Sequence, residues 1–328
     1  MIKFILRKIF SIWISLFAGL TVLFIIVKLT PGTSRIQNIS TAFDIVRQNE
    51  ILDIYSDNKP VIYQLMDWYK NVLLLDFGYS MQNGQKVSNA VKEAFVPTLR
   101  LSLFALFWGI LISLPVAIWS SIKKHKIPDR IISFVMIVVF ALPSYWIGLM
   151  LLNIFSIKLH IFPSSQLYSF DYYSMTFFQK LSNNLYHLFL PSLSLGLLYS
   201  AYFYKYLRNK MIDVLDSEYI LACKARGLSK NVILFSHILP NLLIPFLTLL
   251  STIVPSIFCG TVTIEYIFSI PGLGSTMISA AISRDLPVIM GCATVSFFFI
   301  LITNSLLDII IIILNPKVKL EITNDNTF

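Results

Sequence analysis

Few side chains in this 328-residue sequence are arranged as chemical catalysis or metal binding would require. Its histidines are His125, His160, His187 and His237. Its cysteines are Cys223, Cys259 and Cys292. Neither set has the short spacings of metal ligands or of a disulfide framework, so we expect no metal site and treat the cysteines as small packing residues.

Nucleotide and cofactor motifs are also missing from the sequence. There is no G-x-x-x-x-G-K-[ST] loop, and the pair Gly272 and Gly274 is too short for a dinucleotide loop. No apolar stretch offers a serine with an activating histidine. We therefore predict no catalytic residue and no cofactor, and a membrane-embedded enzyme or a receptor remains the alternative class.

The most distinctive polar segment is EYILACKARGLSKNVILFSHILPN, from Glu218 to Asn241. Its pattern predicts two short helices. Ser217 and Glu218 suit the start of the first helix, and Gly227 suits the left-handed position that ends it. Ser229 suits the start of a second helix that would run to about Leu239, before Pro240.

The first of these helices has a face that suits contact with another protein. Tyr219, Ala222 and Cys223 share one side at helical spacing, and Ala225 and Arg226 lie close by. Two interpretations follow from the residues alone. The helix docks into a groove of a partner, or it is a solvated linker that lies on a membrane surface.

The elements that must position this segment are apolar. The chain is 56% hydrophobic and 13% charged, against about 25% charged in soluble domains. Its mean hydropathy of +0.74 indicates an integral membrane protein. Six stretches are long enough to span a bilayer, and each is expected to form a helix. They are Ile9–Leu29, Leu99–Trp119, Ile131–Phe155, Leu188–Tyr206, Leu242–Thr261 and Pro287–Leu314.

Basic residues predict the orientation of these stretches, since short cytoplasmic connections are rich in lysine and arginine. More than half of the 26 basic residues fall on one side. They are Lys3, Arg7, Lys8, Lys123, Lys124, Lys126, Arg130, Lys205, Arg208, Lys210, Lys224, Arg226, Lys230, Lys317 and Lys319. Both termini are thus predicted to be cytoplasmic, and the net charge of +9 reflects orientation in lipid rather than nucleic-acid binding.

The first connection on the opposite side, about residues 31–98, is long and nearly neutral. A helix-like stretch at Ile62–Leu75 and a turn at Asn83 and Gly84 predict a small folded element outside the membrane.

Three polar side chains stand out within or beside apolar stretches. Glu265 is an acid in an apolar run, so it is either a functional group or a residue at the outer interface, hydrated or paired with Arg284. Asn304 and Asp308 are four residues apart and share one helix face. They suit helix pairing, or they line a cavity.

The polar segment resembles the cytoplasmic "EAA" loop of permease subunits in binding-protein-dependent ABC importers. That signature reads E-A-A, three residues, G, nine residues, I-x-L-P. Ala222, Gly227, Leu239 and Pro240 match it. Leu221 stands where the family often has a glutamate, Cys223 replaces an alanine and His237 replaces the isoleucine.

The resemblance extends along nearly the whole chain and is closest to the dipeptide, oligopeptide and nickel branch. The matching stretches are MIKFILRKIFSIW…LTPGTS, DFGYSMQNGQKVSNAVKEAFVPTLRLSL, ALPSYWIGLMLLNIFSIKLHIFPSS, IEYIFSIPGLGSTMISAAISRDLPVIMG and NSLLDIIIIILNPKVK. In the last of these, Asn315 and Lys317 replace an aspartate and an arginine.

The resemblance implies an all-α integral membrane permease with six transmembrane helices, a cytoplasmic coupling helix and a small external segment between the first two helices. It implies residues 1–95 as first helix and external segment, 96–316 as permease core and 317–328 as cytoplasmic tail. Glu218–Gly227 would be the coupling helix in an ATPase groove, with His237, Leu239 and Pro240 supporting the loop.

The same resemblance implies the partners and the cargo. Partners would be a second homologous permease, two cytoplasmic ATP-binding subunits and an external substrate-binding protein, in a bacterial cytoplasmic membrane. The expected cargo is short peptides, with nickel or a metal–chelate complex as the alternative.

Overall fold

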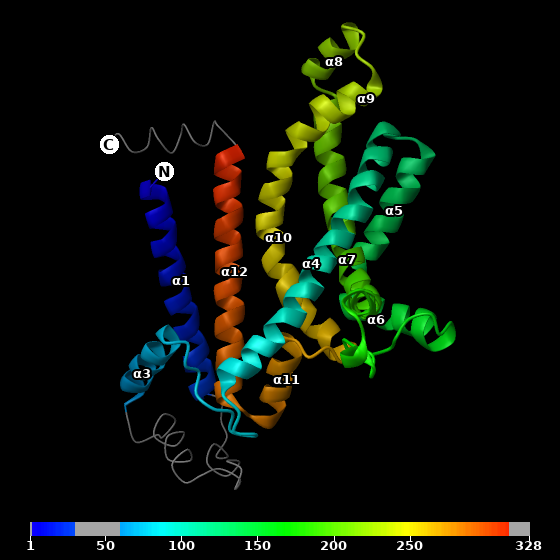
Figure 1. The fold of residues 1–328 in the computed structure, drawn as a ribbon. Coiled ribbons are helices and arrows are strands. Elements are labelled where there is room, and N and C mark those ends of the chain that lie inside the picture. Colours follow the sequence, from blue (N-terminus) through cyan, green and yellow to red (C-terminus); the bar gives the residue numbers. More distant parts are fainter. Residues whose placement is uncertain (1, 30–59, 315–328) are drawn as a thin grey trace. The chain divides into compact units, whose positions relative to one another are not determined.

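The computed structural model describes residues 2–29 and 60–314, and most of these residues are helical (Figure 1). The helices are α1 (Ile2–Leu29), α3 (Val61–Leu73), α4 (Val87–Ile122), α5 (Ile127–Ala141), α6 (Ser144–Leu151), η2 (Leu152–Lys158), η3 (Tyr172–Ser174), α7 (Phe177–Leu215), α8 (Glu218–Ala225), α9 (Lys230–Val232), η4 (Ile233–Ile238), α10 (Leu239–Ile267), α11 (Leu273–Ser283) and α12 (Leu286–Leu314). Among the described residues, extended backbone pairs only at an isolated antiparallel bridge between Tyr79 and Lys86. The predicted all-α class is confirmed.

Three helical stretches in the described residues are long and apolar enough to cross a membrane. They are α4, the continuous stretch Lys230–Ile267 that ends in α10, and α12, and they contain the predicted second, fifth and sixth spans. The fourth predicted span lies within α7, which is 39 residues long and much more polar overall. In α1, the apolar stretch Phe10–Ile26 is shorter than these helices. The prediction of a multi-pass membrane protein is confirmed.

The third predicted span, Ile131–Phe155, is not one straight helix. It is divided between α5 and the α6–η2 pair, which are bent by 101° relative to each other. Leu142 has the extended backbone angles φ −82° and ψ 135°, and Pro143 follows it. A proline disfavours helical geometry in the preceding residue and lacks the N–H that would continue the helix. Counting this bent pair as one span raises the number of candidates to four.

The chain divides into two compact units, the first of which groups Met1–Thr98 with Pro271–Ile302. Two sequence predictions are confirmed in this unit. The stretch expected at 62–75 forms α3, and Gly84 adopts φ +70° in the expected turn. Residues 30–59 of the predicted external segment lie outside the described residues.

A buried carboxylate holds the turn of this first unit. Asp285, which is 3% exposed, accepts hydrogen bonds from the Ser80 hydroxyl, from the Met81 N–H at 3.1 Å and from the Gln82 N–H at 3.4 Å. Its own carbonyl accepts the N–H of Ile289 at 3.1 Å, in the first turn of α12. Asp285 therefore joins the turn at residues 80–85 to the start of α12, which is distant in sequence.

The second unit groups Leu99–Ile270 with Thr303–Phe328, and α7 lies at its centre. This helix contacts α5, α6 and α10. A methyl group at Gly196 of α7 would lie 2.5 Å from Cβ of Trp108 and 3.1 Å from the carbonyl oxygen of Ala105, both in α4. Only glycine permits this approach, and close contact of this kind holds helices together where lipid supplies no hydrophobic drive.

Candidate functional site

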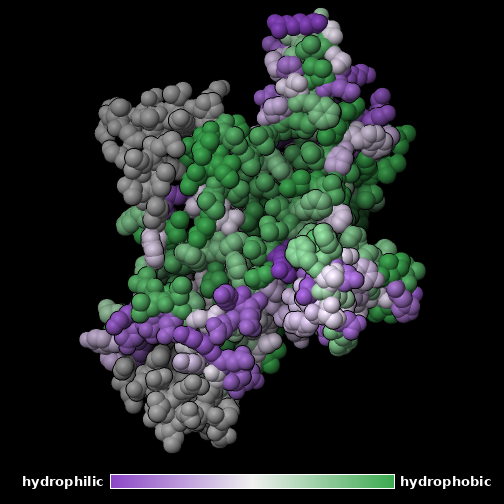
Figure 2. Space-filling model, viewed as in Figure 1, coloured by the Kyte–Doolittle hydropathy of each residue, from purple (hydrophilic) through white to green (hydrophobic). Residues whose placement is uncertain are grey.

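The candidate site is the polar segment, which α8 and α9 form at the end of α7 and α10 in the second unit (Figure 1). Hydrophilic residues gather on this tip, whereas hydrophobic residues dominate the helices beneath it (Figure 2). Asp216 caps α7, and Glu218 lies in the first turn of α8, where a negative charge suits the helix dipole. The predicted cap by Ser217 is not formed, because its hydroxyl donates to the Val214 carbonyl at 2.6 Å.

The C-terminus of α8 is set by local sequence, as predicted. Gly227 has φ +77°, the left-handed conformation that glycine adopts without strain. The Leu228 N–H donates to the Cys223 carbonyl at 3.3 Å, and the Gly227 N–H donates to the Lys224 carbonyl at 3.0 Å. This pair of bonds is a Schellman motif, and it turns the chain sharply after two helical turns.

One side of α8 is buried against its own scaffold. Ile220 is 0% exposed and Cys223 is 5% exposed. They pack in a cluster with Met211 of α7, with Ile233 and Ile238 of η4 and with Leu242 of α10. Cys223 thus supports α8 from beneath and does not belong to an outward-facing surface with Tyr219 and Ala222.

The other side of α8 is exposed, and we call it the α8 outer face. It consists of Glu218, Tyr219, Leu221, Ala222, Lys224, Ala225 and Arg226. Leu221 is 67% exposed and stands between small and basic neighbours. Four residues predicted from the sequence lie on this face: Tyr219, Ala222, Ala225 and Arg226. Leu221 also lies there as an exposed apolar side chain, and the sequence analysis gave it no role in docking.

A hydrogen bond and a ring contact between α8 and η4 fix one edge of the outer face. The Tyr219 hydroxyl hydrogen-bonds to Nδ1 of His237, and the two rings meet edge to face with centroids 5.5 Å apart. His237 lies in η4, a π-helical turn. The expected stop at Leu239 is wrong, because Ser229 caps α9 and the helix then continues through η4 and Pro240 into α10. Pro240 lies at the junction where the π-helical η4 passes into α10.

A buried ion pair anchors the scaffold behind α8. Arg208 of α7 binds Asp129 of α5 through two bonds, Nε to Oδ1 at 2.8 Å and Nη2 to Oδ2 at 2.7 Å. Asp129 is 2% exposed and also accepts the Ser120 hydroxyl of α4 and the His125 N–H at 3.0 Å. The Tyr204 hydroxyl bonds to Ser120 at 2.8 Å. Three helices therefore meet at one charged pair.

Sequence reasoning missed this network, since it counted Arg208 only as a charge that orients the chain. The available signal was Asp129, an acid among basic residues immediately before the apolar run of α5. A second ion pair lies nearby at the surface, where Nζ of Lys124 is 2.6 Å from Oδ2 of Asp216. It connects the α4–α5 link to the residue that precedes α8.

The remaining predicted residues lie away from α8. Glu265 is fully buried near the end of α10, which excludes hydration from the surface of this chain. Asn304 and Asp308 are partly buried on α12. The Asn304 Oδ1 atom is buried without a hydrogen-bond partner among the described residues. The described structure brings neither Glu265 nor this pair to the polar segment.

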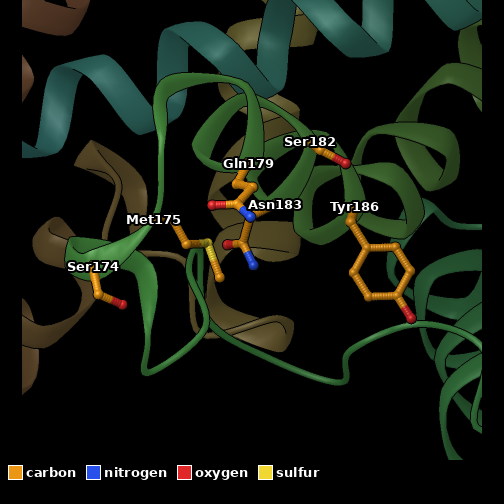
Figure 3. A pocket seen from close by; sticks show the side chains of 6 residues that line it. All are labelled: Ser174, Met175, Gln179, Ser182, Asn183 and Tyr186. Atoms are coloured by element: carbon orange, nitrogen blue, oxygen red, sulfur yellow. The ribbon is translucent and has the colours of Figure 1, made fainter.

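A hollow of about 520 Å³ lies at the start of α7 (Figure 3). Its polar groups already hold the loop together. The Gln179 Oε1 atom accepts from the N–H and hydroxyl of Thr176, and the Asn183 side chain exchanges hydrogen bonds with Ser169. The lining has no ionisable acid–base pair, and the described residues contain no cluster of three or more potential metal ligands. The α8 outer face is therefore the stronger candidate.

Comparison with known proteins identifies what this arrangement is similar to. Residues 109–320 match the family model described as "Binding-protein-dependent transport system inner membrane component". The oligopeptide transport system permease protein AppB of Bacillus subtilis (strain 168) is 30% identical over 93% of this chain and 96% of its own length. The nickel import system permease protein NikB of Staphylococcus aureus (strain MRSA252) is 29% identical over 98% of this chain and 94% of its own length.

A solved structure shares the fold. A chain of the MetNI methionine ABC transporter in an inward-facing conformation aligns with a TM-score of 0.57 at 13% identity. The alignment covers 69% of this chain and 96% of the MetNI chain. At this identity the similarity concerns the arrangement of helices alone.

Proposed function

This chain belongs to the family of binding-protein-dependent transport system inner membrane components, and we propose that α8 is the helix through which this ABC importer permease receives the motion of its ATPase. The permease performs no reaction itself, and ATP is hydrolysed in the partner subunits. The observation that carries the proposal is the two-sided character of α8, which is buried on one side by α7, η4 and α10 and exposed on the other.

The α8 outer face has the chemistry of a docking surface. Leu221 and Ala222 offer a small apolar contact, while Lys224 and Arg226 offer cations to an acidic rim. A surface of this kind combines a desolvated centre with a charged border, as protein interfaces do. The apolar residues Ile220 and Cys223 are buried against the scaffold, and the outer face carries the charged residues Glu218, Lys224 and Arg226. We therefore favour a docking element over a linker that lies on the membrane.

The scaffold is suited to transmit a displacement of α8. Ile220 and Cys223 tie α8 to Met211 and Leu242, so that a push on α8 moves α7 and α10 together. The Asp129–Arg208 pair then ties α7 to α5. A helix that has two packed arrangements can be shifted toward one of them by contacts at either of its ends. Such a two-state element couples the ATPase to the membrane helices.

We further propose that the complete importer contains a second related permease, two ATP-binding subunits and an external substrate-binding protein. We propose six membrane spans with both termini in the cytoplasm, in agreement with the distribution of basic residues, so that α8 would lie on the side of the ATPases. In this arrangement residues 1–95 form the first span and external segment, residues 96–316 form the core, and residues 317–328 form a tail. The last segment lies outside the described residues.

We infer that the cargo is short peptides. The inference is supported by the similarity to an oligopeptide permease along almost the whole chain. The alternative cargo, nickel or a metal–chelate complex, is supported by the similarity to a nickel permease. Uptake of labelled dipeptides, oligopeptides and nickel by a deletion strain, with and without the restored gene, separates the two. Nickel uptake without peptide uptake would replace our choice with the alternative.

The docking proposal is tested by cysteine cross-linking in the assembled transporter. Ala222→Cys places a thiol on the α8 outer face, and it should cross-link to an ATP-binding subunit with a yield that depends on nucleotide. Lys126→Cys, which is also exposed and lies in the α4–α5 link, is the matched control and should give little product. If Ala222→Cys captures no ATP-binding subunit while uptake is intact, the assignment of α8 is wrong.

A further inference from the structure

The helix α3 of the first unit exposes aliphatic side chains. Its buried residues are Gln64 and Trp68, each 4% exposed. Ile62, Met66 and Leu73 are 56%, 60% and 58% exposed. A helix at the surface of a water-soluble domain has the opposite arrangement, because its apolar stripe faces the core. The exposed side of α3 therefore suits an apolar environment.

The exposed aliphatic residues share one side of α3 with a tyrosine. Ile62, Met66, Tyr69 and Leu73 follow each other at intervals of four, three and four residues, which is the repeat of a single helix face. We call these four residues the α3 stripe. Asp67 is five residues after Ile62, which puts it about 140° away around a helix of 3.6 residues per turn. The exposed surface of α3 is thus amphipathic.

Tyr69 fastens the α3 stripe to α1, which lies beside α3 (Figure 1). Its hydroxyl donates to the Phe17 carbonyl at 2.8 Å and also contacts Oγ1 of Thr21. The rings of Tyr69 and Phe17 meet edge to face with centroids 4.7 Å apart. Phe17 and Thr21 belong to the apolar stretch Phe10–Ile26 of α1. The contact is therefore made alongside the apolar part of α1 and not beyond its end.

The position of this contact along α1 sets the depth of α3. From Phe17 to Leu29, the last residue of α1, the helix rises about 18 Å at 1.5 Å per residue. With Leu29 at the outer end of a membrane span, Tyr69 meets α1 below the surface of a hydrocarbon core about 30 Å thick. Ile25 follows Thr21 by four residues on the same face of α1, and it is exposed. Tyr69 therefore joins the stripe to a face that continues as an aliphatic surface.

The residues just after α3 extend its apolar surface. Leu74 and Leu75 are each 71% exposed. Leu75 has φ +55°, a left-handed conformation that is unfavourable for a leucine. The Ser88 hydroxyl donates to the Leu75 carbonyl at 2.8 Å, and the Leu75 N–H donates to the Val72 carbonyl at 3.0 Å, so the backbone is held in place. With Leu73 they form a run of exposed leucines, and an apolar patch of this kind marks a contact surface.

We propose that α3 is an interfacial helix, which lies in the outer surface of the bilayer with the α3 stripe turned toward the acyl chains. The inference rests on the proposed function, because it takes α1 as the first membrane span. Interfacial helices bury an apolar face about 5–10 Å into the boundary between headgroups and acyl chains, and their charged residues face water. Asp67 and Lys70 are the exposed charged residues of α3. The stem of Lys70 lets its ammonium group reach the headgroups.

A lipid surface fits the α3 stripe better than a water-soluble protein does. A protein outside the membrane would have to reach α3 alongside the apolar stretch of α1, where acyl chains surround the helix. The exposed members of the stripe carry no charged group, whereas the interface with a separate protein has a polar rim. Tyr63 is also exposed, and tyrosine is enriched at the boundary between membrane and water.

The test measures whether lipid or water reaches each side of α3. The assembled transporter is prepared in a Cys259→Ser background, since the other cysteines, Cys223 and Cys292, are buried. It is labelled with a thiol-reactive fluorophore at one introduced cysteine and placed in bilayers. Brominated acyl chains quench a fluorophore that lies among them, and iodide quenches a fluorophore in water.

The labelled positions form a matched set on one helix. Ile62→Cys and Leu73→Cys carry the fluorophore on the α3 stripe, and Asp67→Cys carries it on the other side of the exposed surface. We expect the probes at 62 and 73 to lose most of their fluorescence in brominated lipid and little in iodide. The probe at 67 should show the reverse.

Two results would overturn the interfacial helix. Equal quenching by iodide at positions 62, 73 and 67 would mean that the stripe faces water. Protection of 62 and 73 from both quenchers would mean that protein covers the stripe, and loss of this protection without the external binding protein would identify that protein as the cover.

The outcomes also separate this inference from the docking proposal. Cross-linking of Ala222→Cys to an ATP-binding subunit would support the docking helix whichever quencher reaches α3. Conversely, quenching of positions 62 and 73 by brominated lipid without that cross-link would refute the docking helix and leave α3 in the bilayer surface.

Discussion

Asp129 and Asp285 are both almost completely buried, but the two carboxylates are stabilised in different ways. Asp129, in the second unit, is neutralised by the bidentate guanidinium of Arg208. Asp285, in the first unit, is held by the Ser80 hydroxyl and by the N–H groups of Met81 and Gln82. The first joins three long helices, and the second shapes a turn.

The two kinds of hydrogen-bond partner predict how each region responds when a side chain is removed. A buried charge without its counter-ion costs several kcal/mol, because no water compensates it. Backbone donors cannot be lost to a side-chain mutation, so the Met81 and Gln82 N–H groups are left unsatisfied only when the acid itself is removed. We therefore expect the region around α8 to be sensitive at either residue of the pair. In the turn at residues 80–85, we expect removal of Asp285 to cost more than removal of the single Ser80 hydroxyl.

The largest effect is expected for Arg208→Met, which keeps the length of the stem and removes the cation. Leaving Asp129 buried and unpaired should destabilise the second unit by about 3–5 kcal/mol. Thermal unfolding of the purified complex and uptake of the cargo both report it. The double variant Asp129→Leu with Arg208→Met should recover much of the loss. A loss below about 1 kcal/mol in the single variant would mean that the pair is not desolvated.

A smaller effect is expected for Asp285→Ala. The buried donors at Ser80, Met81 and Gln82 lose their acceptor, at a cost of about 1–3 kcal/mol for each group that water cannot reach. Hydrogen exchange at residues 78–85 should accelerate, while exchange in α8 stays unchanged. Asp285→Asn keeps one acceptor oxygen, so hydrogen exchange in this variant should be faster than in the unchanged protein and slower than in Asp285→Ala. Equal acceleration in α8 would contradict the independence of the two regions.

Two glycines with the same backbone angle allow the comparison to be sharpened. Gly227 and Gly78 both have φ +77°, and a methyl group at either would meet no atom within 4 Å. Alanine at each position should therefore cost about 1–2 kcal/mol through the backbone alone. Only Gly227→Ala should raise the number of ATP molecules hydrolysed for each cargo molecule imported, since only it reshapes the end of α8. The same ratio in both variants would argue against α8 as the coupling element.

The smallest effect is expected for Lys124→Met. Its pair with Asp216 is 2.6 Å long, as short as the buried pair, but the two side chains are 31% and 60% exposed. An ion pair in water contributes about 0–1 kcal/mol, so stability and uptake should change little. Raising the salt concentration should reduce even this difference. A loss comparable to that of Arg208→Met would show that burial is not what distinguishes the two pairs.

Predictions from the sequence were most accurate where local chemistry decides the structure. The end of α8 follows from Gly227, because the left-handed position needs no information from elsewhere in the chain. The turn at Gly84 and the helix α3 were found for the same reason. The long apolar runs of α4, α10 and α12 were recognised because they must match the thickness of a bilayer.

Predictions failed where packing between distant residues decides. Cys223 has the spacing of the outer face but lies over Met211 and Leu242, which no pattern within α8 reveals. The 101° bend after Leu142 depends on Pro143, whereas the hydropathy pattern alone predicts one continuous span there. The pairing of Asp129 with Arg208 joins residues far apart in sequence, and a single sequence offers no indication of such a contact.

The π-helical turn η4 lies between the docking element α8 and the long helix α10. A π turn contains one residue more than an α turn, so it advances the direction of all later side chains by about 100°. The angular phase of α10 is thus set by a single surplus residue within Ile233–Ile238. If this segment tightened into an ordinary α turn, α10 would have to rotate about its own axis, and each of its side chains would swing away from where it now points.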